Sequence, residues 1–201
     1  MSIILASRFH CFAVKESLSR KSPTNDTSPP GRSNAALGYS NSSLYIFGGL
    51  NQTTGWLGDV WKGDLGSDNT VTWTQLDSGD ALTPRDKMAF CQSENVVYLI
   101  GGFGPIEGIE DEADEEEDSG ELKAEKETQQ AMQLGWFDEV LEFDLSSCKI
   151  TEVTWTGFDG VAGKAAANAY YSDGNIYIFG GRSPTGRRYI NYSFSIFHFV
   201  Q

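Results

Sequence analysis

An aromatic strand that ends in a pair of glycines occurs three times in this 201-residue chain. The copies read Leu44-Tyr45-Ile46-Phe47-Gly48-Gly49, Val97-Tyr98-Leu99-Ile100-Gly101-Gly102 and Ile176-Tyr177-Ile178-Phe179-Gly180-Gly181. A basic residue stands sixteen positions before each pair, at Arg32, Arg85 and Lys164. The pairs are 53 and 79 residues apart, and one acidic insertion accounts for the longer interval. The chain is therefore an array of repeats with a period near 50 residues.

Each copy is consistent with antiparallel strands in a fixed order. The first strand follows the basic residue and covers Ser33 to Tyr39, Asp86 to Gln92 and Ala165 to Tyr171. A turn then leads into the apolar strand that ends in the glycine pair. Because that strand is apolar almost throughout, we expect it to be covered on both faces by neighbouring sheets. The glycines permit positive φ and close approach of neighbouring backbone where the strand leaves its sheet.

Two copies also align without gaps in a third strand, Trp56 to Leu65 with Trp136 to Leu145. They share the tetrapeptide Val-Thr-Trp-Thr at 71–74 and 153–156, which we predict to be the core of the fourth strand in both copies. The third copy aligns only loosely from Tyr189 and stops at Gln201 before any fourth strand. The alternating segment Arg8 to Val14 is one candidate to supply the strand that this copy lacks.

Four antiparallel strands, the glycine pair, an acidic residue opening the third strand and a tryptophan in the fourth together resemble the kelch repeat. The resemblance covers Gly31 to Gln201 in three copies, the last incomplete. It implies an all-β fold: a partial kelch-type β-propeller of about three four-stranded antiparallel blades that do not form a closed ring. The histidine often found after the basic residue is replaced by Ala35, Met88 and Ala167. The residues that carry the repeat signature are Gly48, Gly49, Gly101, Gly102, Gly180, Gly181, Tyr45, Tyr98, Tyr177, Trp73 and Trp155.

The repeats divide the chain into a leader and three units. We expect residues 1–30 to be a disordered leader and linker, followed by units at 31–80, 81–158 with an acidic insertion at 105–135, and 159–201. Propellers usually close with about 4 to 8 blades, so three blades leave apolar faces at both ends. Three interpretations stay open: a fragment of a longer propeller, association with itself or another kelch chain to complete a ring, or an arc with partly covered faces.

The charge of the chain is concentrated in the insertion. Residues 107–127 carry a net charge of −10 out of −13 for the whole chain, so the remainder is near neutral. A nucleic-acid partner or a membrane surface, each of which would call for a basic face, is therefore not expected. The run Glu110 to Asp118 repels itself and should be disordered, whereas Glu121 to Leu134 predicts a short helix. The insertion is either a solvated loop or an attractor for a basic partner.

The resemblance implies a protein-interaction module, because kelch-like proteins generally bind protein partners through propeller loops. The sequence does not identify the protein partner of this chain. In an up-and-down meander, the loops between strands two and three share a face with the links between repeats. Two other interpretations stay open: blade packing for the tryptophans, and an exposed basic turn for the arginines. The candidate binding residues on the predicted face are Trp56, Trp136, Arg182, Arg187 and Arg188.

The sequence contains few residues in patterns that are typical of catalytic sites. The only histidines are His10 and His198, and no serine or cysteine stands in a recognisable nucleophile motif. We expect no enzyme activity, catalytic residue, cofactor or metal. The alternatives are a metal-dependent enzyme of the kelch superfamily and a propeller fragment without independent function. The three cysteines lack disulfide or zinc spacing, which favours a reducing, cytoplasmic location. The basic residues of the leader leave organelle import as the alternative.

Overall fold

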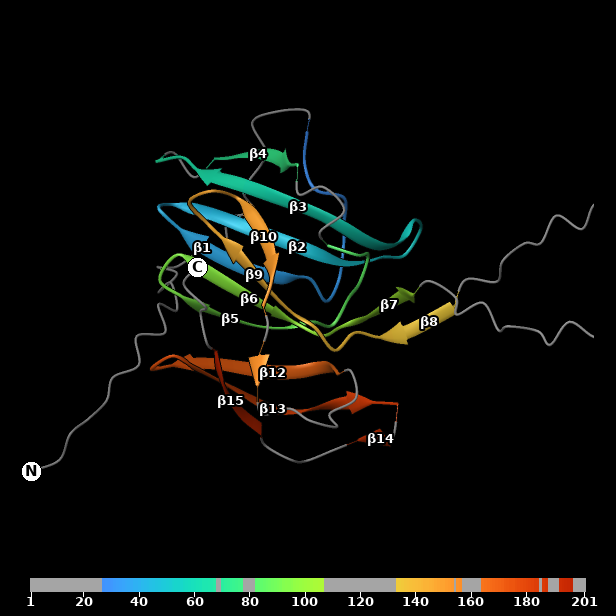
Figure 1. Ribbon diagram of the computed structural model, residues 1–201. Coiled ribbons are helices and arrows are strands. Elements are labelled where there is room, and N and C mark those ends of the chain that lie inside the picture. The colour runs from blue at the N-terminus through green and yellow to red at the C-terminus, as the bar shows by residue number, and fades with distance from the viewer. Residues whose placement is uncertain are drawn as a thin grey trace, which may run out of the picture.

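Three β-sheets lie one after another in the computed structural model. It describes residues 27–67, 70–77, 82–106, 133–153, 155–156, 164–184, 186–187 and 192–196. Within these ranges every regular element is a β-strand, and the three large sheets are antiparallel. Figure 1 shows the sheets stacked in chain order, without closure into a ring. The all-β, partial propeller expected from the repeats is confirmed.

The first sheet has the order β1-β2-β3-β4. Asn41 and Ser42 join the first two strands and both have positive φ, the backbone conformation of a tight hairpin turn that matches the strand twist. At Gly48 the register between β2 and β3 shifts, and beyond the shift the two strands continue as a narrow hairpin. The strands are β1 (Ala36–Ser40), β2 (Ser43–Asn51), β3 (Gly55–Leu65) and β4 (Val71–Leu76).

The second sheet repeats this plan in the order β5-β6-β9-β10. Here the hairpin beyond the glycine pair is separated from the sheet and forms its own two-stranded ribbon, β7 with β8. The predicted third strand, Trp136 to Leu145, is thus split between β8 and β9. The strands are β5 (Ala89–Ser93), β6 (Val96–Ile100), β7 (Phe103–Ile106), β8 (Gln133–Trp136), β9 (Val140–Asp144) and β10 (Lys149–Glu152).

The third sheet corrects the prediction for the fourth strand of the second copy; the first copy's tetrapeptide lies in β4 as predicted. Trp155 and Thr156 do not close the second sheet, because β10 occupies that edge. They form β11, which pairs with β15 and supplies the edge strand that the third copy lacks. The tetrapeptides match in sequence, but β4 contains all of the first one, whereas β10 ends at Glu152, before the second one begins. The strands are β11 (Trp155–Thr156), β12 (Ala165–Ser172), β13 (Asn175–Ser183), β14 (Gly186–Arg187) and β15 (Tyr192–Ile196).

Other predictions concern segments around these sheets. The helix expected over Glu121 to Leu134 is wrong at its end, because Gln133 and Leu134 belong to β8. Pairing with β7 overrides the helix preference of this segment there. The remainder of the insertion, the leader up to residue 26 and the segment Arg8 to Val14 lie outside the described residues.

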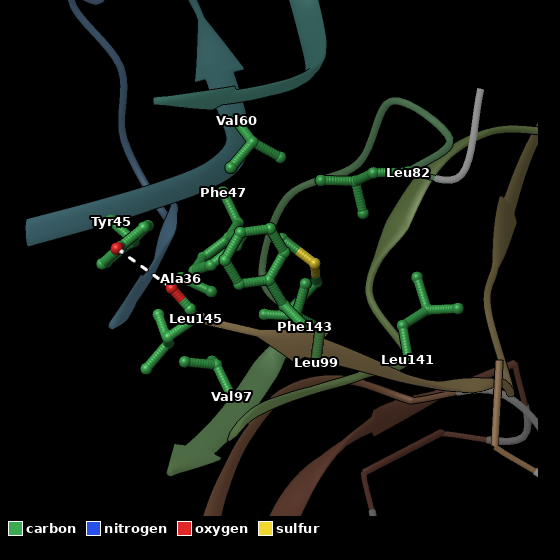
Figure 2. Close-up of a cluster of buried hydrophobic side chains, with 11 residues drawn as sticks. Ala36, Tyr45, Phe47, Val60, Leu82, Val97, Leu99, Leu141, Phe143 and Leu145 are labelled. Atoms are coloured by element: carbon green, nitrogen blue, oxygen red, sulfur yellow. Dashed lines mark hydrogen bonds between the residues drawn. The ribbon is translucent and has the colours of Figure 1, made fainter. Parts of the chain in front are cut away.

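The apolar faces of the sheets meet in two clusters. Figure 2 shows the cluster between the first and second sheets, where Phe143 contacts Phe47 at a ring-centroid distance of 4.8 Å and Tyr45 at 5.7 Å. Between the second and third sheets, Tyr98 stacks on Tyr171 at 5.5 Å. As expected, the middle sheet is covered on both faces, so its strand β6 is apolar at every position.

Backbone hydrogen bonds repeat at both boundaries between sheets. Gly49 donates its N–H to the carbonyl of Arg85 at 2.8 Å, and Gly102 donates to the carbonyl of Lys164 at 2.7 Å. One strand position further in, Lys87 donates to Asn34 at 3.1 Å, and Ala166 donates to Lys87 at 2.8 Å. The sheets are therefore joined by one repeated set of main-chain contacts as well as by apolar packing.

The repeated contacts explain the glycine pairs. All six glycines have φ between +53° and +116°, a region that favours glycine. A Cβ on Gly48 would lie 2.8 Å from the carbonyl oxygen of Arg85, and one on Gly101 would lie 2.2 Å from that of Lys164. The first glycine of each of these pairs is thus needed both for its own backbone conformation and for the approach of the next sheet.

Candidate interaction face

Three hairpin arms extend from the same side of the sheets, as Figure 1 shows. They are the far ends of β2 and β3, the ribbon β7–β8, and the pairing of Arg182 with Arg187 between β13 and β14. The link between the first two repeats runs beside them, since a Cβ on Gly58 would meet the carbonyl oxygen of Leu82 and one on Gly104 that of Pro84. We call this side, with its arms, the arm face.

The repeated basic residues are used inside the fold. Arg32 holds Asp59 with two hydrogen bonds and donates to the carbonyl of Gly48 at 3.0 Å. Burial raises the pKa of the Asp59 carboxyl, but hydrogen bonds from Arg32 and Trp61 outweigh it and hold that pKa below its usual value. The charges of this pair are compensated within the first sheet, so they do not form a binding site.

The second repeat uses its arginine in the same way. Arg85 is 1% exposed and forms an ion pair with Glu139 at 2.6 Å. Its guanidinium also lies 3.5 Å from the ring centroid of Phe137. Glu139 takes the place of Asp59, which is the acidic residue that the sequence places at the opening of the third strand. Both arginines therefore tie the base of an arm to the start of the first strand.

A buried carboxylate lies under the arm face between the first two sheets. Asp86 has no exposed surface, and its oxygens accept hydrogen bonds from Asn34 at 3.0 Å and from the indole of Trp56 at 3.2 Å. The ammonium of Lys87 lies 3.0 Å from the same carboxylate. A buried charge needs such partners, so Asp86 fixes the orientation of Trp56. The other repeats have Ser33 and Ala165 at this position, a difference by which sequence reasoning could have found it.

Three aromatic side chains form a row across two arms. The ring centroids of Trp56 and Phe103 are 6.2 Å apart, and those of Phe103 and Trp136 are 5.1 Å apart, both edge to face. Lys87 places its ammonium 5.8 Å from the Phe103 centroid. All three rings are half-buried. The structure thus joins two predicted candidates, Trp56 and Trp136, through Phe103, which the sequence analysis did not single out.

The remaining predicted residues are distributed over other parts of the fold. Arg182 is exposed on β13, and Arg187 is its register partner on β14. Arg188 lies outside the described residues. Trp73 is half-buried on β4 and covers Gly63, whereas Trp155 lies in β11. Arg182 and Arg187 therefore belong to the third arm and are not part of the aromatic row.

In the described part of the chain, no three histidine, cysteine, aspartate or glutamate side chains gather as metal ligands. Among the same residues no helix is long and apolar enough to cross a membrane. Cys91 is buried, and burial raises the pKa of its thiol to about 12. The aromatic row on the arm face is the feature of this region that most resembles a binding surface.

Stacked four-stranded sheets, glycine pairs at the sheet boundaries and paired hairpin arms together define an arc of a kelch-type β-propeller. The model of the KLHDC2/KLHL20/DRC7 Kelch-repeats domain matches residues 4–183, and the chain belongs to this family. The match begins before Gly31, so it includes residues that were assigned to the leader.

A solved structure supports the fold. The chain is similar to the structure of YjhT, with a TM-score of 0.52 and 17% sequence identity. The similarity covers 78% of this chain and 36% of YjhT, so this chain matches little more than a third of the length of YjhT. No curated protein matches the sequence.

Proposed function

We propose that this kelch-repeat domain binds a protein partner through its arm face, with the row of Trp56, Phe103 and Trp136 as the central contact. Kelch-repeat domains generally serve as protein-interaction modules. The row is the observation that carries the proposal. It offers a large apolar surface held in place by ring contacts and by the buried Asp86, so little side-chain entropy is lost on binding.

The surroundings of the row favour a partner that presents apolar side chains. Leu134 is 46% exposed on β8, beside Trp136 in the same arm. Lys87 already has Asp86 as its ionic partner, so a ligand need not supply a charge to the centre of the face. The arms extend from sheets that are fixed to one another, which is the usual setting for binding loops on a rigid scaffold.

A matched pair of variants tests the proposal. The double variant Leu134→Ala/Trp136→Ala removes the Trp136 ring from the row. The hydrogen bond from Trp56 to Asp86 stays, and we expect the fold to be kept. Phe90→Ala is the control, because Phe90 is 38% exposed on β5 and lies on no arm. Proteins captured from a lysate by the wild-type chain should also be retained by the control. Contact residues of this type typically contribute 2 kcal/mol or more, so the double variant should bind them at least about 30-fold more weakly.

One result of this experiment would contradict the proposed contact. If a purified captured protein binds the double variant and the wild-type chain with the same affinity in calorimetry, the arm face is not the contact. A further variant lacking residues 107–127 separates the role of the acidic insertion. If the insertion attracts a basic partner, its removal weakens binding at low salt and has little effect at high salt.

A further inference from the structure

The outer face of the third sheet carries the same glycine pair that contacts the next sheet at the two boundaries within the chain. In the first and second sheets, the first glycine of the pair lies against the carbonyl of the next basic residue, at Arg85 and Lys164. Gly180 keeps the same conformation, with φ of +72°, but no atom lies within 4 Å of where its Cβ would be. Gly181 keeps a positive φ of +93° as well. The backbone at this face is shaped for a neighbour that the described chain does not supply.

The side chains of this face lead to the same conclusion. Phe179 occupies the position that Phe47 and Ile100 have in the other two sheets. Phe47 pairs in register with Ala36, Ile100 with Ala89, and Phe179 with Asn168. Phe47 is 0% exposed and Ile100 is 6% exposed under the next sheet, whereas Phe179 is 44% exposed. Tyr170 is also 45% exposed on this side. Large aromatic side chains are thus left open where equivalent residues are covered.

The first sheet carries the complementary half of the contact. Its outer face presents Leu37 at 52% and Tyr39 at 41% exposure. Tyr39 is the equivalent of Tyr171 in strand register. Tyr39 pairs with Leu44 and Tyr171 pairs with Ile176, and each of these partners directly precedes the repeated tyrosine of its strand. Tyr171 stacks on Tyr98 at the boundary between the second and third sheets. Tyr39 is therefore placed to stack on Tyr177, the third-copy equivalent of Tyr98.

We propose that two copies of this chain associate head to tail, with the first sheet of each copy docked on the third sheet of the other. The contact continues the two boundaries already present within the chain. Gly181 would donate its N–H to the carbonyl of Arg32 of the second copy, and Asn34 of that copy would donate to the carbonyl of Ala166. Two arcs of three sheets give six, which lies in the range of about 4 to 8 blades at which propellers close. This inference is independent of the proposed partner contact on the arm face.

A pair of glycine variants tests the docking. Gly180→Ala and Gly174→Ala impose similar backbone strain, because the two glycines have φ of +72° and +77° and open space around them. Only Gly180→Ala places a methyl group against the incoming Arg32 carbonyl. Sedimentation over about a hundredfold range of concentration should show twice 22.1 kDa for the wild type and for Gly174→Ala. Gly180→Ala should dissociate at a concentration at least tenfold higher. A wild-type chain that stays monomeric, or equal behaviour of the two variants, overturns the proposal.

Complementation distinguishes head-to-tail docking from any other dimer. Phe179→Asp removes the face of the third sheet and Tyr39→Asp removes that of the first, so each variant alone should be monomeric. Mixed together, they retain one intact contact and should form a heterodimer. Leu134→Asp is the control for an exposed apolar residue, because Leu134 lies on an arm and not on either face. If the mixture stays monomeric while the wild type is dimeric, or if Leu134→Asp also dissociates the dimer, the proposal is wrong. Leu134→Asp should instead weaken partner binding.

Discussion

The glycine pairs offer a direct measure of how tightly the sheets are joined. In the variant Gly101→Ala, the new Cβ would lie 2.2 Å from the carbonyl oxygen of Lys164 and 3.0 Å from that of Phe137. Both obstacles are backbone atoms, so neither can move aside without displacing its strand. Gly174 provides the matched comparison, since it has φ of +77° in the β12–β13 turn with open space around it, against +60° for Gly101.

The expected magnitudes follow from these contacts. A side chain in the left-handed region costs roughly 1–2 kcal/mol, and both variants should pay this strain. At Gly101 the overpacking adds about 1–3 kcal/mol. The hydrogen bond from Gly102 to Lys164, now 2.7 Å long, would also be weakened, with a loss of up to about 1 kcal/mol. Gly101→Ala should therefore be less stable than Gly174→Ala by about 1–4 kcal/mol.

Equilibrium unfolding in urea, followed by tryptophan fluorescence and circular dichroism at one chain concentration, measures this difference. Gly101→Ala should lower the transition midpoint far more than Gly174→Ala, and the slope should stay similar if both variants unfold in a two-state manner. Equal losses in the two variants would show that the second and third sheets are not held together at Gly101. The explanation of the glycine pairs given above would then be wrong.

Two further predictions concern ionisable groups. Because the folded pKa of Asp59 lies below its unfolded value, its ionised form stabilises the fold above about pH 4, and this contribution is lost as pH falls through the lower, folded pKa. Asp59→Asn should thus cost roughly 1.5–3 kcal/mol at pH 7, since Arg32 loses a charged partner, and the deficit should shrink in thermal unfolding below pH 4; a constant deficit would contradict this. The buried Cys91 thiol, with a pKa of about 12, should resist alkylation at pH 8 in the folded chain and react only in denaturant, as peptide mass spectrometry would show; rapid labelling without denaturant would refute its burial.

The sequence was sufficient to predict the repeated part of the fold because the repeated residues make local, equivalent contacts. The aromatic strand, the turn before it and the glycine pair recur in all three sheets, and each occupies the predicted place. The placement of Trp155 could not be predicted in this way. Whether that residue extends β10 or pairs with β15 depends on strands distant in sequence, and the shared tetrapeptide contains no information about that choice.

The candidate face shows a similar limit. Trp56 and Trp136 were visible because they recur, but Phe103 and Asp86 occur at single positions and acquire meaning only from their neighbours in space. A pattern search gives weight to what is repeated. A contact between two different repeats, such as that of Trp56 with Asp86, has no repeated counterpart in the chain to indicate it.

Residues that recur in every copy and residues that occur in one copy only have different roles. In the first two copies, the repeated arginines and acids are paired within the fold, the tyrosines are packed between sheets, and the first glycines of the pairs meet the backbone of the next sheet. Such residues are common to any blade and cannot distinguish one partner from another. In the proposed contact, specificity must then come from residues that one copy has and the others lack. On the arm face these are Lys87 and Phe103, with Asp86 buried beneath the face, together with the exposed Arg182 of the third arm. The aromatic row crosses from the first repeat to the second. A surface that joins two different repeats occurs once in the molecule, whereas a surface made only of the repeated residues of one blade occurs in each blade.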